Sequence, residues 1–270
     1  MSVKLPLVIE PTELKQYLNS DDVIIVDLSS PTTYVQYHIP GAVFLNYEWI
    51  VRIEQPRMGL LPTEEQLNNV LGSLGLAKDK HVVVYDDEGG GRASRFLWTL
   101  EIAGHKNFSI LNGGIQAWSN HRNEISSKIS YPRPCEYKCE MAYETVATRQ
   151  FILDHLSDEN VVILDTRSPA EFSGRKVFAQ RGGHIPGAIN MEWTDAMDKE
   201  KEKCFKPENE LRLLLESKGI TPEKTIVTHC QTHHRSAHTY IMLKSLGYEN
   251  IKGYPGSWSD WGNEPNTPIE

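Results

Sequence analysis

The pentapeptide HIPGA occupies residues 184–188, and the same five residues recur at 38–42. Around each copy, further matches follow in the same order. They are VIIVD at 23–27 with VVILD at 161–165, KHVVVYD at 80–86 with KTIVTHC at 224–230, and LNGGIQAW at 111–118 with IKGYPGSW at 251–258. Four matches in the same order indicate an internal repeat. The chain therefore contains two copies of one domain.

Each copy alternates short β-branched runs with segments of helical periodicity. The runs HVVVY and TIVTH lack alternation, which is typical of strands buried on both faces. The segments ASRFLWTLEIAG and SAHTYIMLKSLG place apolar residues at helical spacing and end near a glycine. This order predicts an α/β fold of two tandem domains, each a mainly parallel sheet with helices on both faces.

The domain boundary is predicted from a stretch near residues 120–143 that lacks periodicity. It contains Pro132 and Pro134, which interrupt regular structure. We predict a first domain at 1–124, a linker at 125–142 and a second domain at 143–270.

The composition of the 270 residues is that of a globular protein, with 39% hydrophobic and 24% charged residues. The net charge of −8 argues against nucleic acid as a partner, since phosphate contacts need a basic surface. No segment approaches the roughly 20 apolar residues that span a bilayer, and the start MSVKLPLVIEP is unlike a signal peptide. Four cysteines without a CxxC pair favour a reducing compartment. We predict a soluble, cytoplasmic protein without a membrane partner.

The segment TIVTHCQTHHRSAHTYIMLKSLG, residues 225–247, is the strongest candidate for a catalytic site. A buried strand is predicted to end at His229, a loop to begin at Cys230, and a helix to begin near Ser236. Loop amides, the positive end of the helix and the charge of Arg235 would all favour a thiolate. We therefore predict Cys230 to be a reactive nucleophile with a lowered pKa, rather than an inert buried thiol.

The histidines near Cys230 raise the alternative of a zinc site. They lack the usual CxxC or HxxxH ligand spacing, and adjacent His233 and His234 are poorly placed to bind one ion. We predict no metal and no cofactor, with these side chains at the loop rim or in hydrogen bonds.

Together these motifs resemble the rhodanese family, specifically its tandem-domain thiosulfate sulfurtransferases, over nearly the whole chain. YVQYHIPGAVFL at 34–45 resembles the first hallmark of the family. YPGSWSDW at 254–261 resembles the closing hallmark, with Asp260 where Glu is usual. The loop CQTHHR, residues 230–235, is similar to the six-residue active loop, in the variant found in bacterial enzymes.

The resemblance implies a double-displacement reaction on Cys230. The thiolate takes the outer sulfur of thiosulfate or a related small anionic donor, sulfite leaves, and a persulfide remains. Cyanide or a thiol then accepts the sulfur, and a protein could serve as the acceptor. The residues that would bind the donor or shape the pocket are Gln231, Thr232, His233, His234 and Arg235.

Two departures from the family leave parts of the site open. CQTHHR matches neither the basic loop of mammalian-type thiosulfate enzymes nor the small loop of mercaptopyruvate enzymes, so thiosulfate and 3-mercaptopyruvate both remain candidate donors. Family members also use an arginine before the second HIPGA, where an insertion of eight residues carries Arg175 and Arg181. The insertion is either a lip of the pocket, which we favour, or a surface loop with two solvated arginines.

Three further residues have structural alternatives. Trp193 either walls the pocket or packs in the core. For Asp165 and Arg167, a salt bridge at the strand end is favoured over a role in bracing the site.

The first copy is predicted to be a catalytically inactive rhodanese-like domain. Aligning Lys80 with Lys224 places Asp86 opposite Cys230, and aspartate cannot form a persulfide. Asp87 and Glu88 follow and would repel an anionic donor.

Two other function classes compete with this prediction. Cysteine phosphatases also use a Cys-loop-Arg cradle, but theirs has five residues between Cys and Arg, whereas four lie between Cys230 and Arg235. A non-enzymatic module that presents sulfur or docks a partner is the second alternative, and the intact Cys230 and Arg235 weigh against it. The sequence leaves the natural acceptor, the pathway and the oligomeric state open.

Overall fold

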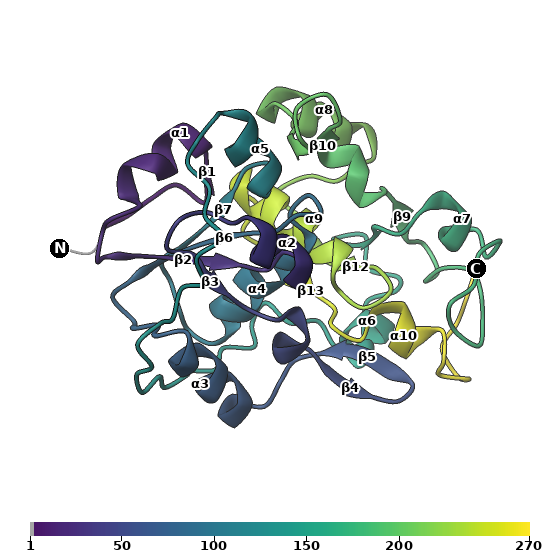
Figure 1. Cartoon of the computed structure of the whole chain (residues 1–270). Helices are drawn as coiled ribbons and strands as arrows, with labels where there is room; N and C mark the ends of the chain where they lie inside the picture. Colours follow the sequence, from purple (N-terminus) through teal and green to yellow (C-terminus); the bar gives the residue numbers. More distant parts are fainter. Residues whose placement is uncertain (1–2) are drawn as a thin grey trace. The chain divides into compact units, whose positions relative to one another are not determined.

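The computed structural model describes residues 3–270, which divide into two compact units (Figure 1). Unit 1 consists of the described residues up to Ile50 together with Pro62–Ala142 and Asp198–Phe205. Unit 2 consists of Val51–Leu61, Tyr143–Met197 and Lys206–Glu270. Each unit thus takes one segment from the other half of the sequence. The stretch 125–142 lies in unit 1, and the domain boundaries drawn from the sequence stay predictions.

Unit 1 is built around a five-stranded parallel sheet of order β1-β7-β6-β2-β3. All five residues of β6 are buried, as expected for a central strand without alternation. The strands are β1 (Val8–Ile9), β2 (Val23–Asp27), β3 (Val43–Phe44), β6 (His81–Tyr85) and β7 (Phe108–Leu111). The helices are α1 (Pro11–Leu14), η1 (Lys15–Tyr17), α2 (Pro31–Gln36), η2 (Tyr47–Ile50), α3 (Glu64–Ser73), α4 (Gly91–Ile102) and α5 (Gly114–Asn120).

Unit 2 is built around a four-stranded parallel sheet of order β13-β12-β8-β9. Its strands are β8 (Val161–Asp165), β9 (Ile189–Asn190), β12 (Thr225–His229) and β13 (Ile251–Gly253). Its helices are α6 (Arg149–Asp154), α7 (Pro169–Phe172), η3 (Trp193–Ala196), α8 (Glu208–Ser217), α9 (Arg235–Ser245) and α10 (Ser257–Trp261). Two short ladders complete the chain, the antiparallel hairpin of β4 (Arg52–Glu54) and β5 (Arg57–Leu60), and the pair β10 (Met197–Asp198) and β11 (Cys204–Phe205).

The strand orders confirm the repeat. The order β7-β6-β2-β3 in unit 1 corresponds, strand for strand, to β13-β12-β8-β9 in unit 2. Helices flank both sheets, as the alternation of strands and helices predicts (Figure 1). The α/β fold class is therefore confirmed.

The HIPGA motifs form the same corner in both units. The His38 ring stacks on Tyr34, with ring centroids 4.1 Å apart, and its Nδ1–H donates to the Tyr34 carbonyl. The His184 ring stacks on Phe172 at 3.7 Å, and its Nδ1–H donates to the Phe172 carbonyl. The repeated motif thus serves packing, in agreement with its presence in both copies.

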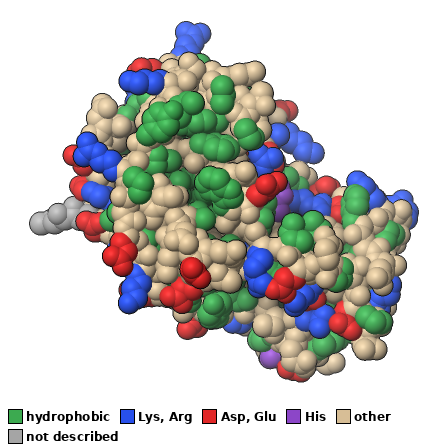
Figure 2. Space-filling model, turned by 60° about the horizontal axis from the view of Figure 1, so that its bottom comes forward, with side chains coloured by type: hydrophobic (Ala, Val, Ile, Leu, Met, Phe, Trp, Pro, Cys, Tyr) green, Lys and Arg blue, Asp and Glu red, His purple; other side chains and the backbone are tan. Residues whose placement is uncertain are grey.

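The surface mixes charges of both signs. On the face drawn in Figure 2, Lys and Arg side chains lie among Asp and Glu side chains, with hydrophobic side chains between them. This face has no broad basic area of the kind that binds nucleic-acid phosphates. Among residues 3–270, no helix combines the length and the apolar character needed to cross a membrane.

Candidate active site

The loop that carries Cys230 joins the central strand of unit 2 to a long helix. Strand β12 ends at His229 and α9 begins at Arg235, so the predicted strand-loop-helix arrangement is confirmed. A loop after a parallel strand lies at the carboxyl edge of the sheet, where α/β proteins place their ligands. His233 takes a left-handed conformation, with φ +54°, which turns the short loop into the helix.

The Cys230 sulfur is buried and surrounded by groups that stabilise negative charge. The residue is only 1% exposed. Burial alone would raise the pKa of the thiol, but the charge of Arg235 and hydrogen bonds from Ser236 and the Thr232 amide outweigh it. The pKa of Cys230 therefore lies below that of an ordinary cysteine, as the sequence predicted.

Arg235 is held in place by Glu171, a residue that the sequence analysis did not select. Its two terminal nitrogens donate to the two carboxylate oxygens of Glu171, at 2.7 and 2.8 Å. Burial would raise the pKa of Glu171, but hydrogen bonds and charge from Arg235, aided by Ser168, lower it to about 2. The pair fixes a permanent cation beside the sulfur. The sequence signal for Glu171 is its capping box with Ser168, which predicts a helix start and not this pairing.

Helix α10 supports the loop backbone from the other side. The Cys230 N–H donates to Ser257 Oγ (3.3 Å), and the Cys230 carbonyl accepts from the Trp258 N–H (3.0 Å). The Gln231 carbonyl accepts from the Ser259 N–H at 3.0 Å. The closing motif YPGSWSDW thus fixes the loop, although neither serine was selected from the sequence.

Three comparisons with known proteins place the whole chain in one family. The model of the rhodanese-like domain matches residues 10–121 and 148–264. The chain belongs to the rhodanese family. A thiosulfate sulfurtransferase of Azotobacter vinelandii is 45% identical, with 98% of this chain and 97% of that protein aligned. One from Pseudomonas aeruginosa is 43% identical over the same shares.

A solved structure gives the same fold. The crystal structure of SseA from Escherichia coli, described as showing the rhodanese fold of 3-mercaptopyruvate sulfotransferases, superposes with a TM-score of 0.83. It is 26% identical and matches 94% of this chain and 99% of its own. The tandem rhodanese architecture predicted from the sequence is therefore confirmed.

The two arginines of the insertion in the second rhodanese domain are placed differently. Arg181 donates to main-chain carbonyls of the C-terminal segment, including those of Trp261 (3.1 Å) and Thr267 (2.8 Å). Arg175 is exposed and its Nε donates to Ser173 Oγ at 3.0 Å. Arg181 thus has a structural task, and Arg175 lies on the surface of the insertion.

The other predicted site residues lie in the loop or, for Trp193, beside it. The Gln231 amide donates to the Phe178 carbonyl (3.2 Å), which joins the loop to the insertion. His233 is fully buried, with Nδ1 2.7 Å from Ser236 Oγ. Trp193 is half-buried, with its ring 6.1 Å from the ring of His234.

The strand-end charges are structural. Arg167 donates from Nε and Nη2 to the buried carboxylate of Asp165, which confirms the predicted salt bridge. Burial is the main cause that lowers the pKa of His229 to about 4, although Asp165 opposes it. His229 is therefore neutral near pH 7. Among residues 3–270, no cluster of three or more His, Cys, Asp or Glu could hold a metal ion.

In the first rhodanese domain, the corresponding loop is filled by a carboxylate. Asp86 Oδ1 accepts the N–H groups of Glu88, Gly89 and Gly90 at 2.8–3.1 Å, and Oδ2 accepts that of Ala93 at 3.0 Å. Burial, and then the charge of Glu88, raise the pKa of Asp86, whereas the amide hydrogen bonds favour its charged form. The N–H groups of this loop thus surround the Asp86 carboxylate, at the position where the second domain has the Cys230 sulfur.

Proposed function

We propose that this protein is a thiosulfate sulfurtransferase that carries sulfur on Cys230. The observation that supports the proposal most directly is the buried Cys230 sulfur, with Arg235 and the Ser236 and Thr232 donors around it. Relatives over 40% identical along nearly the full chain bear this name. The thiolate is the reactive form of cysteine, so a site that favours it suits nucleophilic attack.

The reaction proceeds in two displacements. The Cys230 thiolate attacks the outer sulfur of thiosulfate, a new S–S bond forms, and the old one breaks with its electron pair leaving on sulfite. Cyanide or a thiol then attacks the outer sulfur of the persulfide, and the thiolate returns as leaving group. Donors already placed for the Cys230 thiolate also suit the anionic persulfide, because they need no reorganisation between steps.

The loop residues take distinct roles in this proposal. Arg235 supplies positive charge, and Thr232 supplies an amide to the sulfur. Gln231 and His234 are half-buried and line the approach to the loop, whereas buried His233 orients Ser236. Among the more distant candidates, Trp193 shapes the pocket beside His234. Arg175, which is exposed, contacts the sulfur donor only as it enters the pocket. Arg181 does not contact the donor and instead holds the C-terminal segment in place.

Intact-mass spectrometry tests the proposal. After incubation with thiosulfate, the protein should gain one sulfur atom at Cys230 and release one equivalent of sulfite. Cys230→Ser should do neither. Sulfur uptake by that variant, or its absence in the native protein, would contradict the proposal.

The donor is tested by steady-state kinetics. 3-Mercaptopyruvate is the second candidate, because the SseA structure is described as that of a 3-mercaptopyruvate sulfotransferase and shares the fold. We expect kcat/KM to be higher for thiosulfate. A protein thiol as acceptor can be compared with cyanide in the same assay. The cysteines are free thiols, and we infer a reducing, cytoplasmic location that would keep Cys230 reduced.

A further inference from the structure

The β4–β5 hairpin comes from the first half of the sequence but belongs to unit 2. Gly59 of β5 is buried, with φ +70°, and lies directly against the catalytic loop. A Cβ atom at Gly59 would lie 2.1 Å from the Thr232 carbonyl oxygen and 2.8 Å from its carbonyl carbon. Both distances are below the 3.0 Å that real Cβ atoms keep, so only glycine fits here.

A second contact joins the hairpin to the loop through α10. The Met58 N–H donates to Ser259 Oγ (2.9 Å), and the same hydroxyl lies 3.2 Å from the Met58 carbonyl oxygen. The main-chain N–H of Ser259 in turn donates to the Gln231 carbonyl. The hairpin therefore reaches two successive peptides of the catalytic loop, those of Gln231 and Thr232.

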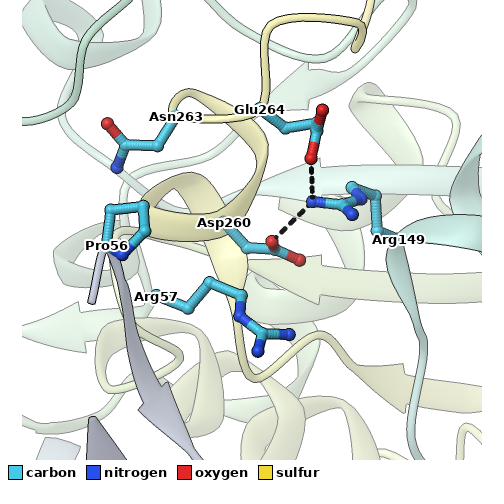
Figure 3. A pocket seen from close by; sticks show the side chains of 6 residues that line it. All are labelled: Pro56, Arg57, Arg149, Asp260, Asn263 and Glu264. Atoms are coloured by element: carbon cyan, nitrogen blue, oxygen red, sulfur yellow. Dashed lines mark hydrogen bonds and ion pairs between the residues drawn. The ribbon is translucent and has the colours of Figure 1, made fainter. Parts of the chain in front are cut away.

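The hairpin tip is seated beside charged residues of α6 and the C-terminal segment. Pro56 and Arg57 line a pocket of about 280 Å³ together with Asp260 (Figure 3). Arg149 bridges Asp260 (2.8 Å) and Glu264 (3.0 Å) on its wall. The contacts of Met58 and Gly59 along β5 therefore hold the hairpin against the loop, and its tip lines this pocket.

We propose that this hairpin is a positioning element of the catalytic loop, and that the close contact of Gly59 with the Thr232 carbonyl sets where Thr232 lies. The Thr232 N–H, which belongs to the preceding peptide, is one of the donors to the Cys230 sulfur, so displacing the residue would weaken the stabilisation of the thiolate. The inference rests on the proposed function only in taking Cys230 as the reacting atom.

Gly59→Ala tests the inference, with Gly219→Ala as a matched control. Gly219 has the same φ of +70° and lies in the same unit, but a Cβ there meets nothing within 4 Å. The two variants therefore share the backbone strain and differ in the clash. Neither changes the charged and titratable groups on and beside the loop, which are Arg235, Glu171, His229, His233 and His234.

The readout is the pKa of Cys230, from the pH dependence of its alkylation by iodoacetamide, followed on the peptide that contains it. We expect the midpoint for Gly59→Ala to rise by about one pH unit, a tenfold loss of thiolate below the midpoint. The midpoint for Gly219→Ala should match the native protein. An unchanged midpoint in Gly59→Ala, or an equal rise in both variants, would overturn the inference.

Ser259→Ala provides a second route if Gly59→Ala does not fold. It removes the side-chain anchor of Met58 but keeps the main-chain bond to Gln231. Its control is Ser217→Ala, which loses only a local hydroxyl contact to the Leu214 carbonyl. A raised midpoint in the first variant alone supports the inference, and no difference between them opposes it. Alkylation needs no sulfur donor, so failure of the native protein to form a persulfide would refute the proposed function separately.

Discussion

At the scale of single residues, the site depends on how a buried sulfur keeps its negative charge. Removing an ion from water costs several kcal/mol even in a relaxed protein. Coulomb attraction to a cation at ~4 Å offsets about 4 kcal/mol of this cost at an effective dielectric constant of ~20. The two effects nearly cancel, so hydrogen bonds decide the balance, and those of Ser236 and Thr232 favour the thiolate.

Glu171→Gln should destabilise the protein by about 3 kcal/mol, because it leaves a partly buried Arg235 without its counter-ion. The carboxylate side chain is 4% exposed and the guanidinium side chain 22%. Urea unfolding of the variant and the native protein at pH 7 measures the difference. Equal stability would show that the pair contributes nothing.

The loss of stability in Glu171→Gln should depend on pH. Folding lowers the pKa of Glu171 from 4.5 to about 2, so its contribution is fully present above pH 4.5. It is lost as the pH falls from 4.5 toward 2, because the folded carboxylate is then protonated. The stability difference between the two proteins should shrink across this window and stay constant above it. A difference that persists at pH 2 would assign the effect to packing.

At the scale of elements, the strand-loop-helix unit was predictable and its supports were not. The run TIVTH, the loop CQTHHR and the following helical spacing are contiguous, so local pattern alone locates Cys230 and Arg235. Glu171 lies 64 residues before Arg235, and nothing in its capping box indicates that partner. Contacts of this kind depend on how distant segments fold together, which one sequence does not encode in any local pattern.

Restoring a cysteine in the first domain should not restore activity. In a Cys230→Ser background, Asp86→Cys would place a thiol in a loop where Gly91 begins the helix, at the position that Arg235 takes in α9. Glu88 lies near and would disfavour a thiolate. Mass spectrometry after thiosulfate treatment should show no added sulfur, with the native protein as positive control. Sulfur on the new thiol would show that the amide ring suffices without the cation.

At the scale of the whole chain, each compact unit borrows a segment from the other half. Residues 51–61 lie in unit 2 and residues 198–205 in unit 1. The repeated motifs predicted two domains correctly, but no motif marks these exchanged segments, because each is a short irregular hairpin or turn between recognisable elements.

A fragment of residues 143–270 should therefore be a poorer catalyst than the full chain. It keeps Cys230, Arg235 and Glu171 but lacks the hairpin that lies against Thr232. We expect slower persulfide formation, by about 100-fold if the loop shifts by ~1 Å. Single-turnover sulfite release measures this, with circular dichroism to establish that the fragment is folded. A folded fragment with the native rate would show that the second half is self-sufficient.

The carboxylate of Asp86 determines what the loop of the first domain can bind. Its two oxygens already accept hydrogen bonds from the loop N–H groups. The first domain therefore holds, as part of its own chain, an anionic group of the kind that the second domain binds only during turnover. Because these N–H groups are already bonded to Asp86, they cannot bind an anionic substrate. The first loop thus keeps the backbone arrangement of an anion site while its own side chain fills that site.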